Sequence, residues 1–557
     1  MSDVNERLQR YERRKGARQP WDTEVEQILN YILPRKSQVI SEKSPGVEEY
    51  SNRIYNDTAQ DANEVLASGL VTNTTPVTEM WMAFDAPAVM RKNADEPVAA
   101  DWFSKVNERT MEALAASNVY NELHELHLER NTACTACIYV EEGRQTALNF
   151  RTIPWGTYVF GENDEGTVDD VQVEFKLTAR QAVQKFGYEN LGERVQKAYD
   201  EPLKRDEEFC FVHSVYPRME RDGNSPERSN KPFASCYDCK EDKKEVQEGG
   251  YDEMPYIVTR FLRWPGYIWG FGPGIRALPT VRQVNEIERN MDVLAEVAAF
   301  PRMLIPSGMV KTVDLAAGGV TPVDESAGQN RPEEWLTNGR YDIGKDRVEI
   351  KDKAIRRAFY NDLFQMLGNM EPGRLTAYEV MQRVAEKLEQ FTPAFQRITS
   401  ELLRPLALRV FGILARAGVY PDFPEELMVP VGADKEGQPI YSPALPSVNF
   451  QSKMALAIRA LENKNFVEYL QIIAPLIGTN PEVLDPIKLV ETSRRIARNL
   501  NLNSSLIRTD DELAEIAESR AEAQQAAQQA EMVAMGAKAA GDMGKAPPGM
   551  LEKAGMA

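Results

Sequence analysis

The chain has 557 residues, a formal net charge of -19 at pH 7 and a sequence pI of about 5.0. This acidity argues against a general nucleic-acid-binding protein, which would be basic, so any contact with DNA has to be local. No segment approaches the roughly 20 consecutive apolar residues of a membrane-spanning helix, and residues 1–19 lack the apolar core of a signal peptide. We therefore expect a soluble intracellular protein of several domains.

The first quarter of the chain is predicted to be helical. Residues 2–33 have helical composition with a basic patch over 13–18, and helical patterns continue over 55–130. The segment 101–130 is predicted to form one amphipathic helix. Breaks are expected near three prolines, Pro76, Pro87 and Pro97.

The next quarter, 134–262, is predicted to be rich in β-strands. One helix, roughly 178–199, is expected to interrupt the strands. The short β-prone runs between turn signals are "ACIYVEE", "ALNFRTI", "TYVFGEN", "VDDVQVEFKL", "EEFCFVHSVYPR" and "MPYIVTRFLRW".

The second half is predicted to be dominated by long helices. A first helix over about 276–300 ends at Pro301, and an irregular insert over 304–349 contains short β-prone runs such as "RVEI". A second helix is expected to begin near Asp352, and a third over about 376–418 with a kink at Pro393 or Pro405. Further helices are expected over 451–500 and in the Ala/Glu/Gln-rich segment that follows, with disorder beyond Gly541.

A glycine-rich turn stands between the β-rich region and the first long helix. Its residues are Gly270, Gly272, Pro273 and Gly274, after the apolar run "YIVTRFLRW". The third glycine is one position too early for a dinucleotide fingerprint, no Lys-Ser or Lys-Thr follows, and Pro273 lacks the backbone N–H that a phosphate would need. We therefore favour a sharp turn that uses glycine dihedral angles and a proline at the helix start.

Cysteine and histidine residues are the other candidates for chemistry. Two C-x-x-C pairs, Cys134 with Cys137 and Cys236 with Cys239, could together hold zinc. Positions three apart in a strand face opposite sides, so we favour small buried thiols instead. His124 and His127 would share one helix face, but no third ligand is evident, and His213 lies in an apolar strand run, so we favour structural roles for all three. We predict no catalytic residue, no metal and no cofactor.

Basic residues gather at the expected start of the second long helix. They are Lys351, Lys353, Arg356 and Arg357. A helix N-terminus favours acidic residues, so this placement suggests an anionic partner, although a solvated face is an equally good explanation. Arg374 stands alone in the Gly/Pro loop between two long helices.

The order of these parts resembles the head-to-tail connector, or portal protein, of short-tailed bacteriophages. "ACTACIYVEE" is similar to a small-residue strand start of that family, and "VHSVYPR" to its His-aromatic-Pro strand. "GFGPGIRALPTVRQVNE" is similar to the start of its stem, and "TAYEVMQRVAEKLEQFTPAFQRITSELLRPLALRVFGILARAG" to its long wing helix. The resemblance covers roughly residues 20–535.

The resemblance implies an α+β fold in a ring-forming subunit. Its parts would be an N-terminal wing region over 1–265, stem helix 1 over 266–303, a clip over 304–352, stem helix 2 over 353–367, a tunnel loop over 368–376, a long wing helix over 377–420, a crown over 421–505, a C-terminal barrel-like helix over 506–535 and a disordered tail over 536–557.

The resemblance also implies where the protein acts and with what. Twelve copies would form a ring at one capsid vertex of the virion, after assembly in the host cytoplasm. The channel would pass phage double-stranded DNA during packaging and ejection, without enzymatic activity of its own. The partners would be the terminase large subunit, the tail adaptor protein, and the major capsid and scaffolding proteins, with no membrane.

The resemblance places three groups of residues at these contacts. The channel-facing tunnel loop would contain Gly368, Asn369, Met370, Glu371 and Arg374. The stem would carry the basic patch and the glycine turn described above. The clip interface would contain Lys311, Asp324, Glu325, Glu333 and Glu334.

Two other functions remain open from the sequence. One is a nucleotide-dependent enzyme that uses the Gly270–Gly274 turn. The other is a helical scaffold protein without a channel.

Overall fold

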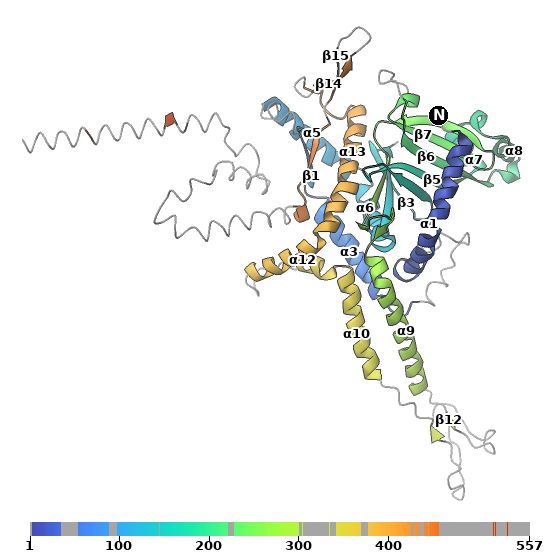
Figure 1. Ribbon diagram of the computed structural model, residues 1–557, viewed down its shortest axis with the longest axis vertical. Helices are drawn as coiled ribbons and strands as arrows, with labels where there is room; N and C mark the ends of the chain where they lie inside the picture. The colour runs from blue at the N-terminus through green and yellow to red at the C-terminus, as the bar shows by residue number, and fades with distance from the viewer. Residues whose placement is uncertain are drawn as a thin grey trace, which may run out of the picture. The chain divides into compact units, whose positions relative to one another are not determined.

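The computed structural model of the chain divides into two compact units, Met1–Ile458 and Arg459–Ala557 (Figure 1). In the second unit the structure describes only residues 516, 518, 519 and 532. In the first it describes 3–34, 54–87, 97–143, 145–220, 228–299, 303–304, 333–334, 341–368, 377–424, 428–433, 439–443 and 445–455. The helices expected over 451–500 and the tail therefore lie almost wholly outside the described residues.

A five-stranded antiparallel sheet forms one layer of the first unit. Its order is β4-β5-β6-β7-β8, so each strand pairs with its neighbour in sequence. The strands are β4 (Tyr158–Glu162), β5 (Val168–Thr178), β6 (Glu208–Pro217), β7 (Phe233–Cys239) and β8 (Lys244–Tyr251). The last two form a hairpin that includes the second C-x-x-C pair.

Helices cover both faces of this sheet. Short helices α7 (Ala179–Phe186) and α8 (Glu193–Asp200) pack a core of their own around Phe186, Phe209 and Phe211. The 3₁₀ turns Tyr188–Asn190 and Pro202–Lys204 flank α8. The single helix expected over 178–199 is thus wrong, because Gly187 at φ 84° ends α7.

The long helix α1 (Val4–Ile32) lies on the other face and confirms the expected N-terminal helix. Tyr11 packs on Val159 and Val212 of the sheet. Arg7, with a side chain only 3% exposed, donates to both carboxylate oxygens of Asp238 at 2.8 and 2.6 Å. Residues of the basic patch over 13–18 also form ion pairs within the chain: Arg14 with Asp170 at 2.9 Å and Lys15 with Glu174 at 2.9 Å.

A three-stranded antiparallel sheet of order β3-β2-β9 lies next to the first sheet and shares its core. The strands are β2 (Thr135–Glu142), β3 (Leu148–Ile153) and β9 (Tyr256–Arg260). Trp155, Tyr158 and Phe160 pack around Trp269 in this shared core, with ring centroids 4.7 to 6.3 Å from it. The β-prone runs of the sequence are confirmed as strands.

Three further helices lie in the described residues before 134, namely α3 (Thr58–Thr74), α5 (Pro97–Ala115) and α6 (Val119–Ala133). The segment 101–130 is therefore two helices and the single-helix prediction is wrong. The break comes at Ser117 and Asn118, where both side chains bond backbone groups: Ser117 Oγ donates to the Leu114 carbonyl, and the Asn118 amide bonds the backbone of Phe150.

The described residues of the second half are largely helical as expected, with different boundaries. Their helices are α9 (Pro273–Ala299), α10 (Tyr341–Ala358), α11 (Asn361–Gly368), α12 (Ala377–Ile398) and α13 (Arg404–Arg416), with a π-helical turn, η7 (Thr399–Leu403), between the last two. Small strand pairs complete the unit: β1 (Met82–Asp85) with β16 (Ser447–Phe450), β10 (Leu262–Arg263) with β11 (Gly270–Phe271), β12 (Met303–Leu304) with β13 (Glu333–Glu334), and β14 (Met428–Ala433) with β15 (Pro439–Pro443).

The distortion expected in the long wing helix is found at η7, directly before Pro405. A proline in a helix clashes with the carbonyl four residues earlier, here that of Glu401. The π-helical turn widens the backbone at this point, and the N–H of Arg404 bonds the carbonyl of Thr399. At Pro393, by contrast, α12 continues through the proline.

Candidate functional site

The pair α9–α10 is the structural feature that the sequence predicted as a stem. The two helices lie side by side and antiparallel, and the pair extends away from the sheets in Figure 1. Lys351 Nζ donates to Gln283 Oε1 at 2.7 Å. Nearer the far end, Gly344 packs on Met291, and a Cβ at position 344 would lie 2.7 Å from the Met291 sulfur. These two contacts fix how the helices align along their length.

The glycine turn before α9 is a site of close backbone packing. A Cβ on Gly270 would lie 2.1 Å from the Cys134 carbonyl oxygen, and one on Gly274 would lie 2.2 Å from the Thr132 carbonyl oxygen. None of Gly270, Gly272 and Gly274 has a positive φ, so the expected use of glycine dihedral angles is wrong. The glycines are needed because the turn presses against the end of α6 and the start of β2.

The same contacts bear on the nucleotide alternative. The backbone N–H of Gly270 donates to Thr135 Oγ1 at 2.8 Å, so it is already satisfied within the protein. Pro273 is the first residue of α9, as predicted from its fixed φ and missing N–H. The backbone N–H of Gly270 is buried and already bonded, so it is not available to bind a phosphate.

The basic residues expected at the N-terminus of the second long helix lie instead in its C-terminal half. The helix begins at Tyr341, so the β-prone "RVEI" is helical. Lys351 and Lys353 lie in its second half, and Arg356 and Arg357 in its last turn. Basic side chains at a helix C-terminus are favoured by the helix dipole, so the argument for an anionic partner from an unfavourable start is withdrawn.

The end of α10 also differs from the expected single helix over 353–367. The helix stops at Ala358, Tyr360 takes a left-handed conformation with φ 55°, and α11 begins at Asn361. Of the expected tunnel loop, Gly368 is the last residue of α11. The other members, Asn369, Met370, Glu371 and Arg374, lie outside the described residues.

The expected clip is described only where its two ends meet. Met303 and Leu304 pair antiparallel with Glu334 and Glu333, next to the far end of the helix pair. This pairing brings the two sides of the insert together. The remaining clip residues of the prediction, Lys311, Asp324 and Glu325, lie outside the described residues.

Acidic side chains meet where α9 and α10 join the start of α3. Asp352 accepts a hydrogen bond from the Asn56 amide at 3.4 Å, and burial raises the pKa of Asp352, with Asp57 nearby adding to the rise. Burial likewise raises the pKa of Glu288, and Asp292 and Asp352 contribute. The α9–α10 pair therefore carries partly buried acidic side chains close together where it meets the start of α3.

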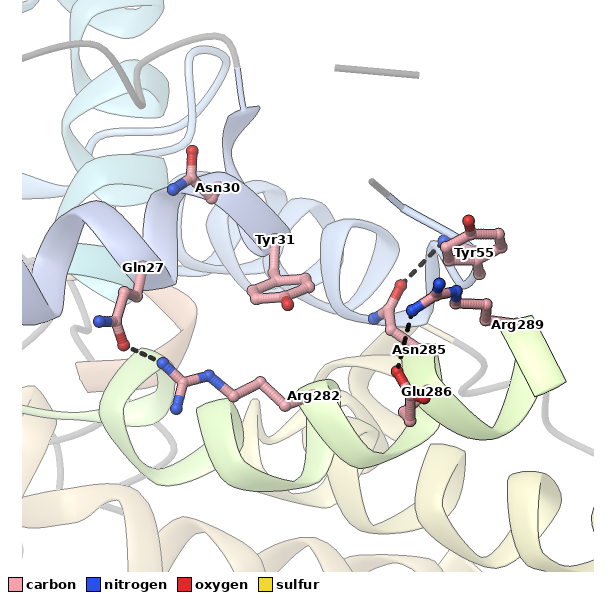
Figure 2. A pocket seen from close by; sticks show the side chains of 8 residues that line it. All are labelled: Gln27, Asn30, Tyr31, Tyr55, Arg282, Asn285, Glu286 and Arg289. Atoms are coloured by element: carbon pink, nitrogen blue, oxygen red, sulfur yellow. Dashed lines mark hydrogen bonds and ion pairs between the residues drawn. The ribbon is translucent and has the colours of Figure 1, made fainter. Parts of the chain in front are cut away.

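A pocket of about 620 Å³ opens on the side of α9 away from α10 (Figure 2). Arg282, Asn285, Glu286 and Arg289 line it from α9 at helical spacing, opposite the end of α1 and residue Tyr55. Figure 2 shows Arg282 bonded to Gln27, and the backbone N–H of Tyr55 donates to Asn285 Oδ1 at 2.8 Å. The sequence prediction missed these residues, although charged side chains at spacings of four and three on one helix face were a visible signal.

Comparison with known proteins matches the chain over nearly its whole length. The family described as "Bacteriophage head to tail connecting protein" matches residues 4–507. The chain belongs to this family. It is 27% identical over 553 residues to the "Probable portal protein" of Bordetella phage BPP-1, covering 98% of this chain and 96% of that protein. It is 26% identical over 549 residues to the "Portal protein" of Salmonella phage epsilon15, covering 96% and 95%.

Membership confirms the connector prediction made from the sequence. The connector family is structural and not a family of enzymes. Its members are virion components that assemble with capsid and tail parts as oligomers. The mixed α+β fold of the described residues agrees with the predicted fold class. No helix among the described residues is long and apolar enough to cross a membrane.

The four thiols of the C-x-x-C pairs and His213 pack within the described core of this connector. Cys134, Cys137, Cys236 and Cys239 are buried as expected, and burial raises the pKa of Cys134 to about 12. Cys239 packs with the α7–α8 core, whereas Cys236 lies on the opposite face with Arg7. The partners of His213 are Tyr256 at 2.7 Å and Ser235 at 2.9 Å. The described residues include no group of three or more His, Cys, Asp or Glu placed to hold a metal ion.

Proposed function

We propose that the chain is the portal subunit of a phage capsid, and that twelve copies form a ring around a channel for double-stranded DNA. One observation carries the proposal: a chain matched over its whole length by portal proteins contains an antiparallel helix pair, α9–α10, that extends from the α/β body. Such pairs, repeated around an axis, would form a tube.

The parts of the subunit then take the following roles. The pair α9–α10 is the stem, and the insert that begins and ends at the β12–β13 pairing is the clip, which docks the terminase large subunit and later the tail adaptor protein. The segment after Gly368 is the tunnel loop, and α12, η7 and α13 form the wing helix. Major capsid and scaffolding proteins contact the assembled ring, which forms in the host cytoplasm before it becomes part of the virion.

The negative net charge of the chain is compatible with a channel for DNA. A net charge of -19 per copy makes the ring strongly acidic, and acidic walls repel phosphates. A basic lining would hold DNA by counterion release, whereas an acidic one lets it slide. Arg374, in the loop predicted to narrow the channel, would act as a local clasp that retards backward movement of DNA.

Imaging of the purified protein tests the proposal directly. Class-averaged electron micrographs should show rings with a central hole, and the mass of the complex by mass photometry should be about twelve times the 62.8 kDa of one chain. A particle that stays monomeric at all protein and salt concentrations contradicts the ring. Calorimetric titration with ATP, GTP and NAD should give no binding heat, and saturable binding would favour the enzyme alternative.

A further inference from the structure

Three polar side chains on one side of α6 are buried without hydrogen-bond partners. His127, Arg130 and Asn131 are each 0% exposed, and spacings of three and four place them on the same side of the helix. Within the described part of the chain, no hydrogen bond reaches either ring nitrogen of His127, any guanidinium nitrogen of Arg130, or the side-chain amide of Asn131. Buried polar groups in native proteins nearly always have a partner, so this cluster calls for one.

The end of strand β9 contributes to the same cluster. The guanidinium carbon of Arg130 lies 5.3 Å from the centroid of the Phe261 ring. Thr259 comes two residues before Phe261 and points to the same side of the strand, and its buried hydroxyl also has no partner among the described residues. Tyr360 and Phe391 pack on Phe261 with ring centroids 6.1 and 6.2 Å away. Aromatic rings therefore border the cluster, and electrostatic interactions in such surroundings are stronger than in water.

Arg130 has no carboxylate of its own, although Glu401 is close by. Both oxygens of Glu401 accept hydrogen bonds from Arg260, and one of them also accepts from Arg397. Four guanidinium groups and two carboxylates meet around this junction, namely Arg130, Arg260, Arg263 and Arg397 with Glu162 and Glu401. The junction of α6, β9 and η7 therefore has an excess of positive charge.

The nearby thiol of Cys134 does not neutralise this charge. Burial raises the pKa of Cys134 to about 12, while the N–H groups of Gly274 and Ile275 act in the opposite direction. The thiol is therefore neutral at pH 7. Burial lowers the pKa of Arg130 to about 9, against the effect of Glu401, so the guanidinium is still protonated at pH 7. A buried charge without a partner is strongly destabilising, so a counter-charge is needed.

The unpaired groups are of the kinds that donate hydrogen bonds to anions. Arg130 offers guanidinium N–H groups, Asn131 an amide NH₂ and Thr259 a hydroxyl. Burial lowers the pKa of His127, and the charge of Arg130 adds to this effect, so the imidazole is neutral and has one N–H to donate. Water would satisfy these donors but would leave the charge of Arg130 in place. Because all four side chains are 0% exposed, the ligand has to be a small ion and not a phosphate of DNA.

We propose that the junction of α6, β9 and η7 binds one small monovalent anion of the halide class. The guanidinium of Arg130 supplies the charge that holds the anion, and His127, Asn131 and Thr259 donate hydrogen bonds to it. The anion neutralises the charge that Glu401 leaves unpaired, and it joins α6 to the end of β9. This inference goes beyond the proposed portal function and does not depend on the ring.

Anomalous scattering tests the site in the wild-type protein. Crystals of the full chain grown in sodium bromide should show an anomalous peak within hydrogen-bonding distance of the Arg130 guanidinium in every copy. Water molecules at the four side chains without an anomalous peak would overturn the proposal. Peaks confined to exposed arginines would mean an adventitious ion only and would overturn it as well.

Thermal unfolding supplies a test in solution. At equal ionic strength, the wild type should unfold at a higher temperature in sodium chloride than in sodium glutamate, by about 2–4 °C when the anion is at ten times its Kd. Arg130→Met should lose this difference, because the charge that holds the anion is gone. Arg180→Met, at an exposed position on α7, is the matched control and should keep it.

The comparison between variants separates a specific site from general salt effects, which act on both variants alike. A chloride effect that persists in Arg130→Met overturns the site. Equal protection of the wild type by sodium phosphate overturns the choice of a halide. If Arg130→Met does not fold, the bromide experiment on the wild type decides. None of these results bears on ring formation, so failure of this inference is distinct from failure of the proposed function.

Discussion

Arg260 and Glu401 join the end of strand β9 to the π-helical turn η7 between α12 and α13. The side chain of Arg260 is 1% exposed, and its Nη2 donates to Glu401 Oε1 at 2.6 Å while its backbone N–H donates to Oε2 at 2.9 Å. Glu162 and Arg397 also contact this pair. The π-helical turn that accommodates Pro405 thus also carries the carboxylate that neutralises a buried guanidinium.

Removal of this carboxylate should destabilise the subunit. Glu401→Ala leaves Arg260 buried with only Glu162 as a charged partner, and breaking such a buried pair costs about 3 kcal/mol. We expect a corresponding fall in the free energy of unfolding from chemical denaturation followed by circular dichroism. Glu389→Gln, on the exposed side of α12, is the control. Equal stability of the two variants would mean that the pair contributes little.

The glycine turn before α9 should tolerate no side chain. Gly274→Ala places a Cβ about 2.2 Å from the Thr132 carbonyl oxygen, so backbone must move, and overpacking of this kind costs about 1–3 kcal/mol or more. Gly16→Ala is the control, since nothing lies within 4 Å of its added Cβ and alanine favours the helix α1. A Gly274→Ala protein as stable as the control would show that the turn has room to adjust.

The attachment of α1 to the large sheet should weaken in acid. Burial acts to raise the pKa of Glu174, but hydrogen bonds from Lys240, Lys15 and Tyr11 outweigh it and lower the pKa to about 2. A carboxylate with a lowered pKa stabilises the fold above its unfolded value of about 4.5, and this contribution is lost as the pH falls from about 4.5 to 2.

The variant Glu174→Gln isolates this contribution. It should be less stable than the wild type at pH 7 by about 2–3 kcal/mol, from the size of the pKa shift, and the difference should shrink at pH 3 and below. Denaturant unfolding at the two pH values measures both quantities. Glu189→Gln, at an exposed position, serves as the control. A stability difference independent of pH would contradict the assignment to ionisation.

The clip should be separable from ring formation. A deletion that tests this has to end before Tyr341, where α10 begins. Replacing 308–329 by a short Gly/Ser linker keeps the β12–β13 pairing and the whole stem. We expect rings of normal mass that no longer bind the tail adaptor in a pull-down. Normal adaptor binding would remove the clip assignment.

The proposed role of Arg374 in retarding backward movement of DNA predicts a defect in DNA packaging or retention alone. Arg374→Ala should assemble into normal rings, because a single loop side chain is not needed for packing between helices. Packaged genome length or retention of DNA after packaging should change, measured by nuclease protection of DNA in filled heads. Lys387→Ala, at an ion-paired position on α12, is a control outside the loop. Wild-type packaging and retention by Arg374→Ala would refute the clasp.

Within the described residues, the amino-acid sequence alone determined most element types and their order, apart from the helical "RVEI" run, and it carried the family resemblance. Apolar periodicity and turn residues act over a few neighbours, so the strands over 134–262, the helix after Pro273 and the distortion near Pro405 were predictable. The proline at the start of α9 follows from its own ring, whatever surrounds it. Helix ends were less well predicted. Tyr360 ends α10 in a left-handed conformation that tyrosine rarely adopts, whereas Gly187 is a glycine stop signal that the prediction missed.

Only the tertiary structure decided which distant residues meet. The three glycines before α9 are needed because α6 and β2 approach them, not because of their dihedral angles. The interpretation of the basic residues of α10 changed because the helix begins at Tyr341, eleven residues before the expected start at Asp352. The Arg260–Glu401 pair joins positions 141 residues apart, and α9 is aligned with α10 by contacts such as that of Lys351 with Gln283. Such contacts depend on the packing of whole elements, so local sequence patterns do not encode them.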